Sequence, residues 1–240
     1  MSFIRRHLFS YLTIVTAVTV AVVFCANLYT SAVSMVDAAA APVIVVIDAG
    51  HGGEDGGAVS KDGIHESQLN LEIALRLDDL LHLLGQETQM IRREDVSVYT
   101  EGAGTIAEKK VSDLKNRVSI VKRVPNALLV SIHQNMFEDA RYDGAQVFYA
   151  PTAGSQALAE SLQALAAQVL DPDNHRAAKP ADTVYLMKNI SCTGVLVECG
   201  FLSNAAECAK LRTAEYQKQI SIVLAGGITD YIRKADSNEI

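Results

Sequence analysis

Four side chains that can bind a metal ion or transfer a proton stand at His51, Glu66, His133 and Glu198. His51 follows the apolar run 43–47 within a glycine-rich segment, and glycines leave room for a ligand close to the main chain. His133 and Glu198 each end another apolar run. Two histidines and one carboxylate, with a position left for water, are a ligand set used by catalytic zinc sites. A further carboxylate can move protons during hydrolysis, so the four residues together predict a metallohydrolase.

We expect His51, Glu66 and His133 to bind one ion and Glu198 to act first as base and then as acid. Each residue also has a structural interpretation, since Glu66 can stabilise a helix start and a polar residue at a strand end can reach solvent. The coincidence of four such residues favours the catalytic interpretation. His65 competes with Glu66, because neighbours at the start of a helix can both face one edge. The ligand types indicate Zn²⁺, although other divalent metals also fit.

Strands and helices alternate along the chain and must position these residues. Strands are predicted at 43–48, 88–92, 127–132, 144–150, 183–187 and 194–198. The runs at 43–48 and 127–132 are apolar without alternation, which indicates strands buried on both faces. Amphipathic patterns predict helices at about 66–84, 106–123, 155–170 and 216–233, with a short helix that starts at Asn204 and has Glu207 as its capping-box partner. Gly85 is expected to end the first helix, and residues 174–182 to form an exposed connector.

This order of elements predicts an α/β fold: a single domain with a largely parallel six-stranded twisted sheet flanked by helices. In open α/β sheets, ligands bind beyond the carboxyl ends of the strands. His51, His133 and Glu198 follow or end three of the predicted strands, and Glu66 starts the helix that follows the first of them. We therefore expect all four side chains to meet at one edge of the sheet.

The N-terminus carries an apolar segment, residues 8–28, that contains no charged side chain and follows Arg5 and Arg6. A run of this length can cross a membrane, and basic residues before it place the rest of the chain outside. The chain is therefore expected to be exported. A retained anchor is favoured over a cleaved signal segment, for which the small residues 38–41 offer a site. The predicted organisation is an anchor or signal segment at 1–30, a linker at 31–42 and a catalytic domain at 43–235.

Acidic residues dominate the exported part. Two of the 21 basic residues, Arg5 and Arg6, precede the apolar segment, which leaves 19 basic and 28 acidic side chains after it, a net charge of −9. Such a domain is not attracted to polyanions, so nucleic acid is not expected as a partner. The membrane anchor or a protein partner would have to bring the domain to any anionic substrate.

The cysteines show no C-x-x-C spacing, and we interpret them as structural. A Cys192–Cys199 or Cys199–Cys208 disulfide is the alternative. Cys25 lies in the apolar segment and is expected to be a small apolar residue there.

Four motifs, in this order, resemble the zinc-dependent N-acetylmuramoyl-L-alanine amidases of the Amidase_3 family. They are residues 48–58 (DAGHGGEDGGA), Glu66, residues 131–135 (SIHQN) and residues 197–204 (VECGFLSN). The resemblance covers about 43–233, nearly all of the exported chain. Gln134 and Cys199 depart from the family pattern; neither is a proposed ligand, but both could tune the groove.

The resemblance implies that His51, Glu66 and His133 bind one zinc ion and that Glu198 is the catalytic glutamate. It selects Glu66 over His65. It also implies the bond that is attacked, the amide joining the lactyl group of muramic acid to L-alanine of the stem peptide. Glu198 would protonate the departing alanine nitrogen.

Three shorter runs are similar to one branch of the family, the germination-specific cortex amidases: residues 101–102 (EG), 113–118 (DLKNRV) and 185–189 (YLMKN). This branch acts during spore formation, where removal of the stem peptide is the first step towards muramic-δ-lactam. The similarity implies a location at the forespore membrane or cortex. Arg93, Arg117 and Arg176 match recurrent basic positions, for which structural ion pairs are favoured over binding of a substrate carboxylate.

The expected partners are peptidoglycan glycan strands with stem peptides, the membrane through the N-terminal segment, and an activating protein. The loop 99–105, which has two glycines and no periodicity, is a candidate lid or partner site. Two other functions stay open. One is another peptidoglycan zinc hydrolase, a carboxypeptidase or a deacetylase. The other is a non-catalytic peptidoglycan-binding protein, which retention of the candidate catalytic residues disfavours.

Overall fold

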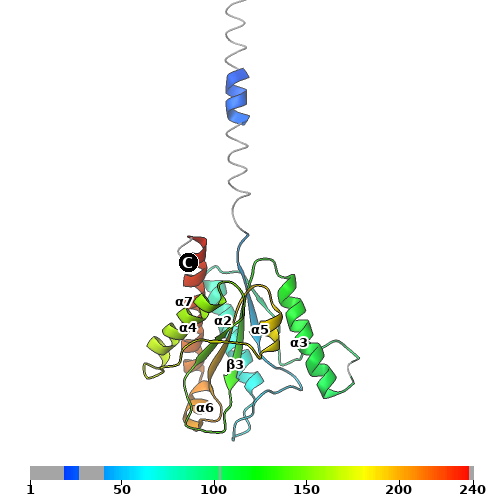
Figure 1. The fold of residues 1–240 in the computed structure, drawn as a ribbon, viewed down its shortest axis with the longest axis vertical. Helices are drawn as coiled ribbons and strands as arrows, with labels where there is room; N and C mark the ends of the chain where they lie inside the picture. The colour runs from blue at the N-terminus through cyan, green and yellow to red at the C-terminus, as the bar shows by residue number, and fades with distance from the viewer. Residues whose placement is uncertain (1–18, 27–40, 103, 238–240) are drawn as a thin grey trace, which may run out of the picture. The chain divides into compact units, whose positions relative to one another are not determined.

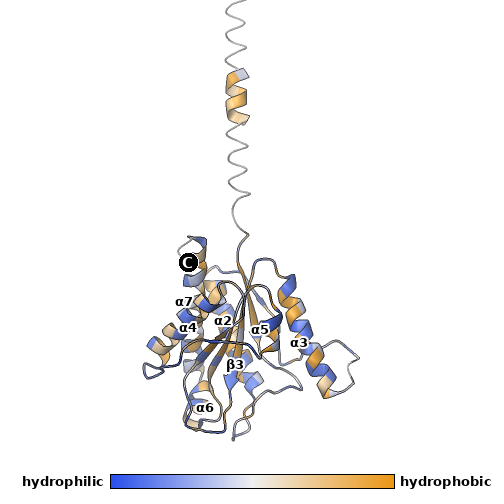
Figure 2. Ribbon diagram, in the orientation of Figure 1, coloured by the Kyte–Doolittle hydropathy of each residue, from blue (hydrophilic) through white to orange (hydrophobic). Residues whose placement is uncertain are grey.

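A computed structural model describes residues 19–26, 41–102 and 104–237 (Figure 1). Residues 19–26 are helical, and Figure 2 shows them as predominantly hydrophobic. Within the described ranges, no helix has the length and apolar character that a membrane crossing requires. The predicted anchor at 1–30 and linker at 31–42 lie largely outside the described residues, and they stay predictions. The chain from Pro42 onwards forms one compact unit.

A six-stranded sheet forms the centre of this unit. Its strands are β1 (Ile44–Ala49), β2 (Thr88–Met90), β3 (Ala127–Asn135), β4 (Gln146–Tyr149), β5 (Lys179–Pro180) and β6 (Thr193–Phe201). The spatial order is β2-β1-β3-β6-β4-β5, and every neighbouring pair is parallel except β4 and β6. The prediction of a single α/β domain with a largely parallel sheet is confirmed.

Helices cover both faces of the sheet. They are α2 (Glu66–Leu83), α3 (Ile106–Arg123), α4 (Ser155–Leu170), α5 (Tyr185–Asn189), α6 (Ala205–Leu211) and α7 (Ala214–Asp236). Figure 1 shows α2, α4 and α7 on one side of the sheet and α3 and α5 on the other. Successive strand residues point to opposite faces, so Ile47 packs in the core under α2, whereas Val46 packs in the core under α3 and α5. Burial on both faces explains the unbroken apolar runs of the central strands.

Local signals set the helix ends. Gly85, with φ +79°, follows the last turn of α2, a conformation that glycine adopts without steric cost. Thr105 and Glu108 form a capping box at the start of α3. Asn204 caps α6 by accepting hydrogen bonds from the second and third backbone N–H groups of the helix. Glu207 does not complete a capping box there, because its carboxylate instead accepts from the N–H groups of residues 144 and 201.

One predicted strand is wrong. Residues 183–187 do not form a strand, because Tyr185–Asn189 forms the short helix α5, which buries Leu186 and Met187. A short apolar run does not distinguish a strand from one helical turn. The sixth strand is instead β5, which has two residues and pairs with β4. It lies inside the segment 174–182, which was predicted to be an exposed connector. Both β5 residues are exposed, so no apolar pattern marked them.

The cysteine side chains are free thiols, and neither alternative disulfide forms. Cys199 and Cys208 are buried, while Cys192 is partly buried. Desolvation raises the pKa of the Cys199 thiol. The structural interpretation of these residues is therefore confirmed.

Candidate functional site

The segment after β1 brings His51 to the carboxyl edge of the sheet. His51 has φ +61°, which is uncommon for a non-glycine residue and marks a constrained turn. Gly50 must lack a side chain, because a Cβ there would lie 2.3 Å from the ring of His133. At Gly57, with φ +68°, a Cβ would lie 2.6 Å from Oε2 of Glu66. These two glycines let the loop pack directly against the candidate ligands.

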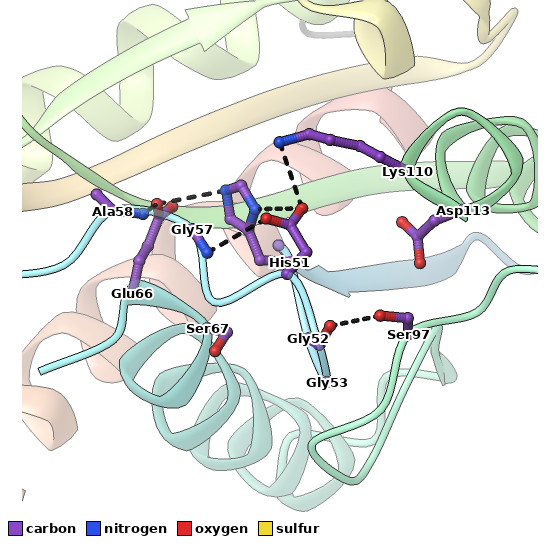
Figure 3. Close-up of polar contacts among 12 residues, drawn as sticks. His51, Gly52, Gly53, Gly57, Ala58, Glu66, Ser67, Ser97, Lys110 and Asp113 are labelled. Atoms are coloured by element: carbon purple, nitrogen blue, oxygen red, sulfur yellow. Dashed lines mark hydrogen bonds and ion pairs between the residues drawn. The ribbon is translucent and has the colours of Figure 1, made fainter. Parts of the chain in front are cut away.

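His51, Glu66 and His133 lie together at this edge and form a candidate metal site. Nε2 of His51 is 3.3 Å from Oε2 of Glu66, and Nδ1 of His133 is 2.8 Å from Oε1 of Glu66. One potential ligand atom from each residue lies within 4.8 Å of the other two. Figure 3 shows Glu66 facing the ring of His51. Two imidazole nitrogens and a carboxylate oxygen at this spacing fit a single zinc-type ion.

Electrostatics keep Glu66 ionised. Burial alone would raise its pKa, but hydrogen bonds from His133 and His51 and their attraction hold the pKa of Glu66 well below its usual value. The side chain is almost fully buried, and Ala58 N–H donates to its Oε2 at 2.9 Å (Figure 3). A buried carboxylate held as an anion is the state that a metal ligand requires.

Asp55 orients His51 from outside the site. Its Oδ2 lies 2.9 Å from Nδ1 of His51, so the His51 tautomer with a proton on Nδ1 donates to Asp55 and directs Nε2 towards Glu66. Lys110 of α3 approaches the same Asp55 oxygen at 3.6 Å. Sequence reasoning missed Asp55, although it stands four residues after His51 in the same motif.

Asn70 supports Glu66 from one helical turn further along α2. Asn70 is fully buried, and its Nδ2 donates to Oε1 of Glu66 and to the carbonyl oxygen of Gly50, both at 3.2 Å. Its Oδ1 accepts from Nε2 of Gln134 at 3.2 Å. Backbone N–H of Gln134 also donates to Oε1 of Glu66. Asn70 was missed in the sequence analysis. It could have been noticed because its polar amide stands directly beside Leu69, a residue of the apolar stripe of the helix. Gln134 lies behind the ligands and contacts Asn70.

Glu198 stands next to His133, because the two residues are register partners in the parallel β3–β6 pair. Its Oε2 is shielded from solvent and has no hydrogen-bond partner among the described residues. Burial raises the pKa of Glu198 to about 7; the charge of Glu66 adds to the shift, and His133 and His51 oppose it. A carboxyl group with a pKa near neutrality can both accept and donate a proton.

His65 does not join the cluster. It is exposed and directly precedes α2, and its ring packs against Gly56. Its neighbour Glu66 starts the helix and points to His51 and His133. The geometry therefore agrees with the choice of Glu66 over His65.

The three arginines behave differently. Arg93 pairs with Asp78 at 2.6 Å, and the buried Arg117 pairs with Asp48 and Asp113, so structural ion pairs are confirmed for both arginines. For Arg176 the expected ion pair is wrong, because no carboxylate in the described part of the chain pairs with it. Its guanidinium group lies over aromatic rings instead.

A small pocket opens beside the candidate ligands on the face of the sheet that α3 and α5 cover. Its lining includes both histidines of the cluster together with polar and apolar side chains: Asp55, Lys110, Leu114, Val184, Leu186 and Leu196. The start of the loop 99–105 lies nearby, since Tyr99, Lys109 and Glu54 line an adjoining pocket. Lys109 pairs with Glu54 at 2.7 Å and lies over the ring of Tyr99. The idea that this loop is a lid or partner site stays a prediction.

Comparisons with known proteins agree with this geometry. Residues 45–230 match the family model described as N-acetylmuramoyl-L-alanine amidase. The germination-specific N-acetylmuramoyl-L-alanine amidase of Bacillus subtilis (strain 168) is 34% identical over 198 residues, which cover 82% of this chain and 83% of that protein. The CwlD amidase from Clostridioides difficile, solved in complex with the GerS lipoprotein, has a TM-score of 0.77 and 39% identity over 79% of this chain and 98% of its own. AmiC2 of Nostoc punctiforme has a TM-score of 0.69 and 30% identity over 80% and 97% of the two chains.

Proposed function

The chain belongs to the Amidase_3 family of N-acetylmuramoyl-L-alanine amidases, and from this premise we propose that it is a zinc-dependent hydrolase of peptidoglycan. The bond cleaved is the amide between muramic acid and L-alanine of the stem peptide. The observation that carries the proposal is the Glu198 carboxyl group beside a cluster of two histidines and a glutamate, with its buried Oε2 making no hydrogen bond to the described residues. Neither part alone indicates hydrolysis, but the two together provide a metal site and a proton carrier.

His51, Glu66 and His133 would hold the ion, and Asp55 and Asn70 would keep two of these ligands in place. Zn²⁺ bound there would polarise the amide carbonyl and lower the pKa of a water molecule. The pocket on the α3 and α5 side of the site would give the substrate room beside these ligands. Each of these residues thus binds or orients, and none of them has to transfer a proton.

Glu198 performs the proton transfers. As a carboxylate it takes a proton from the attacking water, and it then passes this proton to the departing alanine nitrogen. A pKa near 7 lets one group carry out both steps near neutral pH. Because Oε2 makes no hydrogen bond to the described residues, the carboxyl group need not break one before it acts.

The test compares Glu198→Gln with wild-type protein loaded with Zn²⁺. We expect normal zinc content and a fall in kcat of about 10²- to 10⁴-fold, the usual contribution of a general acid–base residue. His133→Ala should lower both zinc content and activity. Glu215→Gln makes the same chemical change at an exposed position and should leave both unchanged. Full activity of Glu198→Gln would remove Glu198 from the mechanism.

Product analysis separates the alternative hydrolases. Mass spectrometry of digested peptidoglycan should reveal peptides with a new N-terminal alanine and intact N-acetylmuramic acid. Release of a C-terminal amino acid would indicate a carboxypeptidase, and release of acetate a deacetylase. Zinc-loaded protein that binds peptidoglycan without forming any product would indicate a binding protein.

We also propose that the enzyme acts in the spore cortex, after export with residues 1–30 as anchor or signal segment. Similarity to the germination-specific amidase of Bacillus subtilis supports this role. The relative from Clostridioides difficile forms a complex with a lipoprotein, which supports an activating protein partner here. Expression of this chain in Bacillus subtilis lacking its own germination-specific amidase should restore muramic-δ-lactam to the cortex, measured by chromatography of digested cortex. Failure of a stably expressed, exported chain to restore it would contradict the cortex role.

A further inference from the structure

A row of polar side chains leads away from the candidate metal site across the ends of three strands. His133 on β3 is paired in register with Glu198 on β6, and Glu198 is paired with Gln146 on β4. Directly paired residues on neighbouring strands point to the same face of a sheet. His133, Glu198 and Gln146 therefore stand side by side on the face covered by α3 and α5.

Arg176 extends this row by one more residue. Its Nη1 donates to Oε1 of Gln146 at 3.4 Å, and its Nε donates to the carbonyl oxygen of Asp143 at 3.0 Å. Its guanidinium carbon lies 4.9 Å from the centre of the Phe201 ring and 5.6 Å from that of Tyr142. Two hydrogen bonds and two aromatic contacts hold the guanidinium group in one orientation.

The hydrogen bonds of Arg176 do not use all the N–H donors of its guanidinium group. Its Nη2 makes no hydrogen bond to the described residues, and the side chain is only partly exposed. By contrast, Arg117 is buried in ion pairs, and Lys109 pairs with Glu54. A planar guanidinium group that is fixed in place and lacks an anionic partner is suited to bind a carboxylate through two hydrogen bonds.

We propose that Arg176 binds the free α-carboxylate of the second residue of the stem peptide and thereby sets substrate specificity. This inference rests on the proposed function, in which Glu198 gives a proton to the departing alanine nitrogen. The peptide leaving group must then start at Glu198. A stem-peptide glutamate joined through its side chain carries a free α-carboxylate about two residues' rise, ~7 Å, from that nitrogen. Gln146 lies one strand spacing, ~5 Å, from Glu198. Arg176 bonds to Gln146 and lies further from Glu198, so its position matches the distance between the alanine nitrogen and the α-carboxylate.

The test uses two soluble muramyl peptides that differ only at this group, one with the free α-carboxylate and one with the α-carboxamide. Purified, zinc-loaded full-length wild-type protein should prefer the carboxylate by about 10- to 100-fold in kcat/KM, the range expected for hydrogen bonds to a charged group. Arg176→Met should lose this preference, because its KM should rise much more for the carboxylate peptide than for the carboxamide peptide. Arg176→Lys should recover only part of the preference, because an ammonium group lacks the planar pair of donors.

Arg141→Met is the matched control, since Arg141 is exposed and pairs only with Asp139 among the described residues. It removes the same charge and should keep the preference. Equal wild-type rates on the two peptides would overturn the role of Arg176, as would equal slowing of both peptides by Arg176→Met. If Arg176→Met does not fold, the comparison of wild type with Arg176→Lys decides, and an unchanged preference in Arg176→Lys overturns the role. Failure of the wild type to release a new N-terminal alanine from either peptide would instead contradict the proposed function.

Discussion

Replacing Asn70 by leucine tests whether this residue, which lies behind Glu66, positions Glu66 as a candidate metal ligand. The change keeps a similar side-chain volume but removes three hydrogen bonds, to Glu66, to Gly50 and from Gln134. The first two partners are not left unsatisfied. Oε1 of Glu66 still accepts from the backbone of Gln134, and the carbonyl oxygen of Gly50 still accepts from Nη2 of Arg92.

The cost therefore concentrates on Gln134, whose Nε2 loses its hydrogen-bond partner inside the core. An unsatisfied buried donor costs about 1–3 kcal/mol, and each lost hydrogen bond to a satisfied partner about 0.5–1.5 kcal/mol. We expect Asn70→Leu to lower the free energy of unfolding by about 2–4 kcal/mol, after allowance for the gain from burying leucine. Loss of an outer-shell partner should also weaken zinc binding by about 10- to 100-fold.

Urea denaturation of the metal-free protein measures the stability, and competition with a chromophoric chelator measures the affinity for zinc. Gln68→Leu is the matched control, because Gln68 lies two residues earlier on the exposed side of α2 and bonds only to Glu72 among the described residues. The control should change stability by no more than about 0.5 kcal/mol. Wild-type zinc affinity in a destabilised Asn70→Leu protein would refute the positioning role and leave Asn70 a purely structural residue.

Two further predictions concern Asp55 and Asp48. Asp55→Ala should lower zinc affinity by about 10- to 100-fold without unfolding the protein, because His51 loses the carboxylate that orients it. A zinc content equal to that of the wild type after dialysis against a chelator would contradict this prediction. For Asp48, burial alone would raise the pKa, but the attraction of Arg117 and the hydrogen bond from Ser131 lower it. Its carboxylate therefore stabilises the fold fully above about pH 4 and progressively less as the pH falls further. Asp48→Asn should lower the free energy of unfolding by about 3 kcal/mol at pH 7. The free energy of unfolding, measured with urea, should then fall less steeply between pH 4 and pH 2 than in the wild type. A slope equal to that of the wild type would contradict this prediction.

The central elements could be predicted because each carries a strong local pattern. The runs that became β1, β3 and β6 are apolar at nearly every position, which burial on both faces requires. The helix α3 has a capping box at its start, and its predicted bounds, 106–123, match the structure. The convergence of His51, His133 and Glu198 followed from one geometric rule, that parallel strands end at the same edge of a sheet.

The remaining features depend on contacts that no local pattern records. His65 and Glu66 both stand at the predicted start of the first helix, so position alone could not show which of them faces the site. In the sequence, only the family motif selected Glu66. In the structure the difference is that Glu66 faces inward from the first turn of α2, whereas His65 is exposed. The α5 helix is a single short turn, and β5 is a strand of two exposed residues, so neither is long enough to show a period. The surroundings of Arg176 come from distant segments, which explains why an ion pair was the wrong expectation.

The direction of β1 sets the distance between the start of the domain and the candidate metal site. This strand begins where the chain enters the domain, after Pro42, and its other end leads to His51. Six residues of strand span ~20 Å, so the reaction centre lies about that distance from the entry point, at the opposite edge of the sheet. If the segment before Pro42 is the membrane anchor that we propose, lengthening or shortening it would change which layer of the wall the enzyme reaches, without altering the candidate metal site.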